Sequence, residues 1–140
     1  MPPRAEEPTA VQRLVIHALG PSANAFYAGK LHPHERRRLA TLWHTQVALS
    51  ARAARLQPVV HYPVEVEFVF SFRASRREYD CDNCHPTVKL VLDGLVAAGI
   101  LTDDSRPYVG AVRMLFARER SERSDRVEVV IREMKEKEEP

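Results

Sequence analysis

The sequence contains no apolar run that approaches the roughly 20 residues of a membrane-spanning helix. Its opening segment, MPPRAEEPTA, lacks the apolar core of a signal peptide, so we expect a cytoplasmic protein that does not enter a membrane. Only two cysteines are present, and in that compartment we expect them to be reduced rather than bridged. No internal repeat or Gly/Ser-rich linker divides the 140 residues, which therefore suit one domain with a modest core.

Net charge is also small, at +2, and does not by itself indicate a nucleic-acid partner. The charge is unevenly distributed, because segment 30–77 holds nine Lys or Arg residues against three acidic ones. Such a local excess suits a phosphodiester substrate, although arginines on a helix or in a loop also occur simply as a solvated surface. The basic residues that we assign to substrate binding are Lys30, Arg73, Arg76 and Arg77.

The pattern of apolar residues predicts the order β-α-β-α-β-β. Val64, Val66 and Phe68 alternate with polar residues, which is typical of a half-buried strand. The expected strands are 11–18, 59–72, 108–118 and 127–131, and the expected helices are 33–56 and a shorter one that begins near Pro86 and ends at Gly99. The last two strands are expected to pair as a hairpin.

This order predicts an α+β fold in which two helices pack on a small mixed sheet of about four strands. Residues 1–10 are interpreted as a disordered lead-in because they combine prolines with alternating charges. Residues 11–134 form the single expected domain, and residues 135–140 form a charged tail.

The residues most suited to chemistry are concentrated in segment 79–104. Asp80 and Asp82 stand two residues apart after a strand, so an extended backbone would point both carboxylates to one side. A helix follows, and the loop after it contains Asp103 and Asp104. We expect this arrangement to gather the acids into a small volume that suits Mg²⁺, with Mn²⁺ as a substitute.

Three polar residues accompany these acids. Lys89 lies four residues before Asp93 on the same helix face. It would either stabilise charge that develops on a phosphate or form a simple exposed pair with Asp93. Asn83 would bind the phosphate or hold the turn, and Asn24 lies in a loop that could face a substrate.

The same segment also spells C-x-x-C-H, the pattern of c-type haem attachment, at Cys81, Cys84 and His85. Haem attachment normally follows export, for which the sequence shows no signal, and a structural zinc would need a second cysteine pair. A redox pair is a further interpretation. The alternative function is therefore a non-catalytic haem- or metal-binding protein, or a basic nucleic-acid-binding adaptor. Incidental cysteines are the simplest interpretation.

An ordered set of residues resembles the RusA-type Holliday junction resolvases, a family of crossover junction endodeoxyribonucleases. The set consists of D-x-D-N at 80–83, a lysine at 89, D-G-L at 93–95, a glycine at 99 and D-D at 103–104. Upstream, Pro21-Ser22-Ala23-Asn24 resembles the P-S-x-N turn of that family, so the resemblance spans most of the chain. The lysine follows the D-x-D-N motif later than is usual in the family, because residues 84–88 intervene.

The resemblance implies a homodimeric, Mg²⁺-dependent endonuclease that hydrolyses phosphodiester bonds in branched DNA, chiefly four-way junctions, during recombination and repair. It implies that Asp80, Asp82 and Asp104 are catalytic metal-binding acids and that Asp103 is an adjacent metal ligand. Lys89 would then be a catalytic cation.

Overall fold

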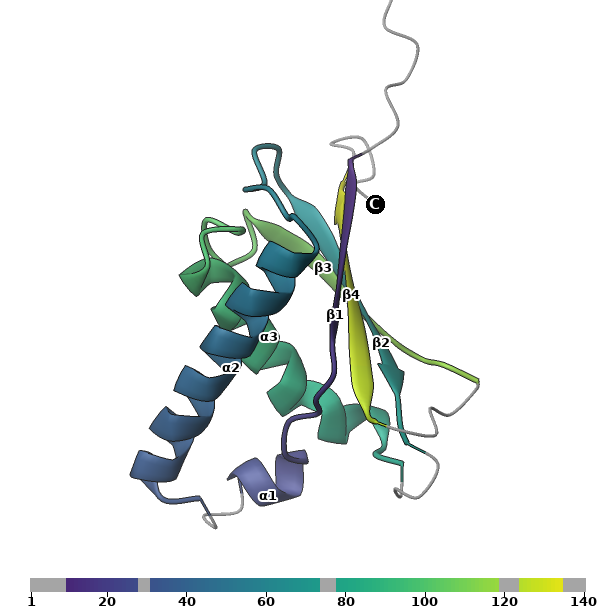
Figure 1. Cartoon of the computed structure of the whole chain (residues 1–140). Coiled ribbons are helices and arrows are strands. Elements are labelled where there is room, and N and C mark those ends of the chain that lie inside the picture. The colour runs from purple at the N-terminus through teal and green to yellow at the C-terminus, as the bar shows by residue number, and fades with distance from the viewer. Residues whose placement is uncertain (1–9, 28–30, 74–77, 119–123, 135–140) are drawn as a thin grey trace, which may run out of the picture.

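The computed structural model describes residues 10–27, 31–73, 78–118 and 124–134. Its helices lie on one face of a four-stranded mixed sheet (Figure 1), which confirms the expected α+β class. In chain order, the elements are β1 (Val11–Ile16), α1 (Ala23–Tyr27), α2 (Pro33–Ala53), β2 (Val64–Ser71), the 3₁₀ turn η1 (Cys81–Cys84), α3 (His85–Ala97), β3 (Val109–Phe116) and β4 (Arg126–Glu133). None of the helices in these four ranges is long and apolar enough to cross a membrane.

The second strand starts at Val64, later than the expected range of 59–72. Pro63 has no N–H to donate to a sheet, which favours a strand that begins after it. The hydroxyl of Tyr62 instead accepts a hydrogen bond from the backbone N–H of Thr102 at 2.9 Å. The segment before β2 is therefore tied to the loop that follows α3.

The expected hairpin between the last two strands is wrong, because the strand order is β1-β4-β2-β3. β4 pairs antiparallel with both β1 and β2, whereas β3 pairs parallel with β2. The helix-facing side chains of β4, Val127, Val129 and Ile131, are at most 2% exposed. The strand with the more deeply buried side chains thus takes a central place, and β3 becomes an edge strand.

As a result, β1, β2 and β3 all run in the same direction. The chain leaves β1 and β2 at one end of the sheet, which we term the carboxyl end, and it enters β3 at the opposite, amino end. Loops at the carboxyl ends of neighbouring strands are a common place for binding sites. The topology therefore brings the segment after β1 and the segment after β2 to the same end of the molecule.

The two long helices pack closely against each other above the sheet (Figure 1). α3 buries Val91 and Leu95 completely, and α2 does the same with Val47. At the crossing, a Cβ atom on Gly94 would lie 2.8 Å from side-chain atoms of Val47. The absence of a side chain at Gly94 therefore sets the approach of α3 to α2.

Gly94→Ala should lower the free energy of unfolding by about 1–3 kcal/mol, because the added methyl group overpacks this contact. Urea denaturation would measure the loss. The cost should shrink in a Val47→Ala background, where the facing side chain has been shortened. An equal cost in both backgrounds would rule out the contact as its cause.

The sheet face opposite the helices carries a network of ion pairs. Arg113 and Arg132 lie 3.5 and 3.4 Å from the carboxylate of Glu67, which is only 7% exposed. At the far side of the sheet, Arg13 pairs with Glu128 at 3.1 Å. This face therefore has most of its charge neutralised within the chain.

Candidate functional site

Two loops meet at the carboxyl end of the sheet and enclose a cavity of about 430 Å³. One loop follows β1 and the other follows β2. The cavity is lined by Ser22, Asn24, Glu78, Tyr79, Asp80 and Asn83. The structure therefore brings Asn24, Asp80 and Asn83 together around one cavity.

The first loop is held in place by the start of α3. The backbone N–H of Gly20 donates a hydrogen bond to the Oγ1 atom of Thr87 at 3.0 Å, and Thr87 is fully buried. A Cβ atom on Gly20 would lie 2.8 Å from the same oxygen, so only glycine permits this approach. Ser22 then accepts a hydrogen bond from the N–H of Ala25 at 3.2 Å at the start of α1. These contacts position Asn24 beside the start of α3.

Thr87→Val should destabilise the fold by about 1–3 kcal/mol, because it leaves the buried N–H of Gly20 without an acceptor. Urea denaturation and faster hydrogen exchange at the Gly20 amide would report the loss. Thr87→Ser keeps the hydroxyl and is the matched control. If the Val and Ser variants behaved alike, the hydrogen bond would not be what anchors the loop.

The second loop is held by a row of aromatic rings that continues the core. Phe72 stacks on Phe116 with ring centroids 6.0 Å apart, and Tyr79 meets Phe72 edge-on at 5.7 Å. The N–H of Asn83 donates to the carbonyl of Asp80 at 3.0 Å, which closes the 3₁₀ turn. The residue before Asp80 is thereby fixed by the core, while the carboxylates of Asp80 and Asp82 belong to exposed residues.

Asp103 and Asp104 lie at the other end of α3. This helix has 13 residues and spans about 20 Å, and β3 begins at the amino end of the sheet shortly after Asp104. Within the described part of the chain, no three His, Cys, Asp or Glu side chains form a group that could hold a metal ion. The expectation that one chain gathers all the acids into a small volume is therefore wrong.

The loop at that end is itself well structured. The hydroxyl of Ser105 donates to the Oδ2 atom of Asp103 at 2.7 Å. This hydrogen bond, with help from the backbone N–H of Asp104, lowers the pKa of Asp103. Asp103 therefore stays ionised and oriented at neutral pH.

Lys89 forms the exposed ion pair with Asp93 that was one of its two expected roles. Its Nζ atom lies 3.5 Å from Oδ2 of Asp93, and both side chains are substantially exposed. Exposed pairs of this kind contribute only about 0.3–0.5 kcal/mol. The ammonium group can therefore leave Asp93 for a stronger anion at little cost.

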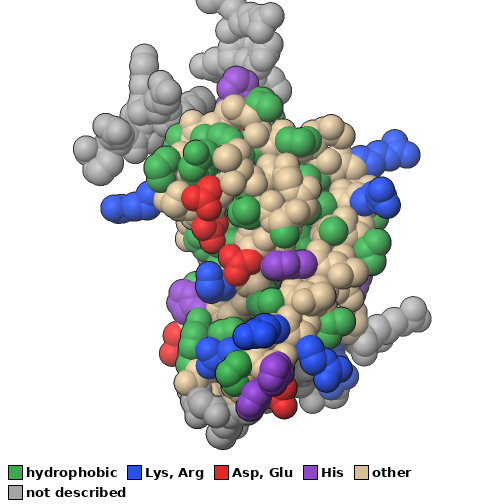
Figure 2. Space-filling view, turned by 90° about the vertical axis from the view of Figure 1, so that its left-hand side faces the viewer, with side chains coloured by type: hydrophobic (Ala, Val, Ile, Leu, Met, Phe, Trp, Pro, Cys, Tyr) green, Lys and Arg blue, Asp and Glu red, His purple; other side chains and the backbone are tan. Residues whose placement is uncertain are grey.

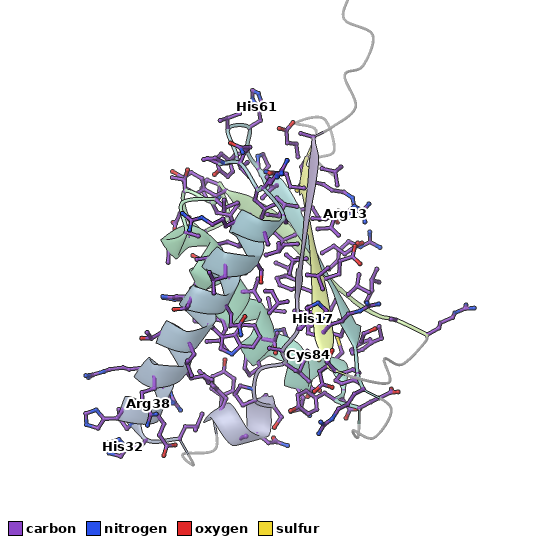
Figure 3. All side chains as sticks on the ribbon, in the orientation of Figure 1. Arg13, His17, His32, Arg38, His61 and Cys84 are labelled. Carbon is purple, nitrogen blue, oxygen red and sulfur yellow. The ribbon has the colours of Figure 1, made fainter. Side chains whose placement is uncertain are left out.

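Basic side chains gather at one end of the helix-covered side, where α1 and the start of α2 lie (Figure 2). Arg36 is held there over the ring of Phe26, 5.0 Å from its centroid, and donates to the carbonyl of Phe26 at 2.8 Å. His32 and Arg38 project outward from the start of α2 (Figure 3). Arg73 is exposed directly after β2. The other assigned basic residues, Lys30, Arg76 and Arg77, lie outside the described residues.

The two cysteines have different environments. Cys81 is exposed, whereas Cys84 is buried between α3 and the sheet (Figure 3). Burial, followed by the nearby Cys81 and Asp82, raises the pKa of Cys84 to about 12. A haem bound through both sulfur atoms would require Cys84 to leave the core, which disfavours that interpretation of C-x-x-C-H.

At pH 8, iodoacetamide should alkylate only Cys81 in the folded protein, because the Cys84 thiol is both buried and neutral. Mass spectrometry would show one adduct in buffer and two in concentrated urea. The protection of Cys84 from thiolate formation should persist as the pH rises past 9, where an unfolded cysteine ionises. Equal labelling of both cysteines in buffer would contradict the buried position.

No family model matches the chain, and no curated protein matches it in sequence. The site therefore stands on its own geometry. Sequence reasoning missed Glu78 and Tyr79, which line the cavity beside Asp80. The alternation of Glu78, Asp80 and Asp82 was the available signal for the first of them, but for Tyr79 the sequence offered none.

Proposed function

We propose that this chain is a RusA-type, Mg²⁺-dependent endonuclease that hydrolyses phosphodiester bonds in branched DNA, chiefly four-way junctions. The observation that carries the proposal is the shared cavity of two distant motifs. The P-S-x-N turn and the D-x-D-N motif lie far apart in the sequence, yet Asn24 and Asp80 line the same space. These are the two motifs on which the family resemblance rests.

The separation of the acids along α3 supports a homodimer with shared metal sites. Asp80 and Asp82 lie at one end of this helix, and Asp103 and Asp104 follow its other end. A two-fold axis across the middle of α3 would place the second pair of one chain beside the first pair of the other. Because such an interface is self-complementary, it would form two identical sites.

The surface that fits this axis is the exposed side of β3. On this edge strand, Val112 and Phe116 on the helix-covered face and Leu115 on the opposite face are 40–42% exposed, so both faces of the edge carry accessible large apolar side chains. β3 begins just after Asp104 and ends beside the aromatic row that supports Tyr79. An antiparallel pairing of two β3 edges would therefore align the start of one with the end of the other.

Within each shared site, Asp80, Asp82 and Asp104 would hold Mg²⁺ through hard carboxylate oxygens, with Asp103 as the adjacent ligand. When bound, the ion supplies charge neutralisation at the phosphate and acidifies a water molecule. Lys89 would transfer its ionic contact from Asp93 to the phosphate. Asn24 and Asn83 would donate hydrogen bonds to the DNA next to Asp80, and exposed Arg73 would contact a flanking phosphate.

The direct test is cleavage of labelled four-way junction, duplex and single-stranded DNA in Mg²⁺ or EDTA. We expect the junction to be cut in Mg²⁺, duplex to be cut far more slowly, and no cutting in EDTA. Light scattering on a sizing column should give the mass of a dimer. A protein that binds all three DNAs alike and cuts none would instead be the basic adaptor considered above.

A further inference from the structure

Beyond Asp80, the cavity is lined by polar and aromatic groups that are not metal ligands in the proposed function. Glu78 and Asp80 contribute carboxylates, and no Lys or Arg among the described residues lines the space. The described carboxylates also do not form a group of three that could hold an ion within one chain. The amides of Asn24 and Asn83 and the ring of Tyr79 give this lining groups that suit an uncharged polar guest.

The remaining groups have the chemistry of base recognition. Tyr79 offers an aromatic ring, and Asn24 and Asn83 offer amides that can both donate and accept hydrogen bonds. An unstacked nucleobase is recognised by an aromatic ring that stacks on it and by polar groups that bind its edges. A volume of about 430 Å³ lies in the range of small-molecule pockets.

The Tyr79 ring is also rigidly placed. Phe72 is only 4% exposed and lies between Tyr79 and Phe116 in the aromatic row. The opposite wall is fixed as well, because Thr87 anchors the loop that leads to Asn24. A preorganised cavity loses little conformational entropy when it binds a guest.

We infer that this cavity binds one unstacked nucleobase of the DNA strand that is cut, next to the phosphate positioned at Asp80. The inference rests on the proposed function and deepens it. Tyr79 stacks on the base, while Asn24 and Asn83 bind its edges. Extruding a base from an intact duplex costs a few kcal/mol, and the cost is smallest where pairing or stacking is already interrupted. The cavity would therefore favour branched DNA over duplex.

The test uses the full chain and four-way junctions that carry 2-aminopurine at the nucleotide beside the cleavage site. Binding in Ca²⁺, without cleavage, should raise the fluorescence severalfold because the base leaves its stack. In Mg²⁺, Tyr79→Leu should slow cleavage at subsaturating enzyme by about ten- to a hundredfold. On a junction that has an abasic site at that position, Tyr79→Leu should cut at the wild-type rate. Tyr79→Phe keeps the ring and should retain most of the activity.

Asn24→Ala is a second test variant, and it should leave the packing of the core intact because Asn24 is exposed. It too should slow cleavage of the intact junction but not of the abasic one. Gln46→Ala, at an exposed position on α2, is the surface control and should change neither rate.

The outcomes separate the two claims. If the wild-type protein cuts no junction in Mg²⁺, the proposed function fails and this inference fails with it. The wild-type protein could instead cut the junction without any change in fluorescence, with Tyr79→Leu and Asn24→Ala slowing cleavage of intact and abasic junctions by the same factor. In that case the proposed endonuclease activity stands and the base-binding cavity is overturned.

Discussion

Asp80→Asn, Asp82→Asn and Asp104→Asn should each lower Mg²⁺-dependent cleavage of a four-way junction by about a hundredfold or more. In the proposed site, each change would remove a charged oxygen ligand from a Mg²⁺ ion that would provide several kcal/mol of transition-state stabilisation. None of these residues belongs to the buried core, so circular dichroism and thermal unfolding should remain close to those of the wild type. Initial rates in Mg²⁺ give the measurement.

Glu128→Gln is the matched control, because it makes the same chemical change on the opposite face of the sheet, where Glu128 pairs with Arg13. It should cut at the wild-type rate. Near-normal turnover by all three Asp variants would remove these residues from the proposed metal site.

Mixing two inactive variants distinguishes shared sites from sites within one chain. In a dimer of one Asp80→Asn chain and one Asp104→Asn chain, one site carries both changes and the other carries neither. Random exchange in an equal mixture should therefore restore about a quarter of the wild-type sites. Because each mixed dimer has a single intact site, it should nick one strand rather than cut two. No recovery after subunit exchange would contradict the shared arrangement.

Val112→Glu and Leu115→Glu should each weaken the dimer by about a hundredfold or more, because each places a charge among the exposed apolar side chains on one face of the proposed β3–β3 interface. Cleavage and Mg²⁺ binding should fall together with dimer mass, since a monomer keeps the acids at opposite ends of α3. Both side chains are 40–42% exposed in the single chain, so the monomer should stay folded. Sedimentation over a concentration series would measure the association.

Leu42→Glu is the control for a charge on an exposed leucine. Leu42 is 62% exposed on α2, away from β3. It should leave both the dimer and the cleavage rate unchanged. A monomeric but fully active Val112→Glu variant would show that one chain suffices, and the proposed interface would have to be abandoned.

Much of the fold is predictable because local periodicity determines it. The alternation around Phe68 correctly predicts a strand there, although β2 is more deeply buried than the half-buried strand expected, and the long helix begins at Pro33 as expected. Which strands pair with each other is not determined by local sequence, and this is why the hairpin prediction failed. β3 and β4 both read as strands, but only the relative burial of residues such as Val129 and Val112 decides which of them is central.

The candidate site is likewise predictable from the sequence only in part. The spacing of Asp80 and Asp82 predicted an extended segment with both carboxylates on one side, which is wrong because Asp82 lies in the 3₁₀ turn Cys81–Cys84. Asn24, from the other loop, lines the same cavity as Asp80. The helix expected from Pro86 to Gly99 already implied that Asp82 and Asp104 lie apart, and the expectation of one cluster did not take its length into account. Proximity in sequence suggested a cluster, whereas helix geometry imposes a distance of about 20 Å.

The central position of β4 also has a consequence for folding during translation. β1 has no strand partner until β4 emerges, and the Arg13–Glu128 contact spans 115 positions. Until β4 is synthesised, the edges of β1 and β2 that β4 will cover remain unpaired in the nascent chain. Unpaired strand edges are prone to aggregation. Any translation product that stops before β4 would lack the middle of its sheet. Such a product would also lack the strand that holds β1 and β2 in one sheet, and with it the arrangement that brings the two loops of the candidate site together.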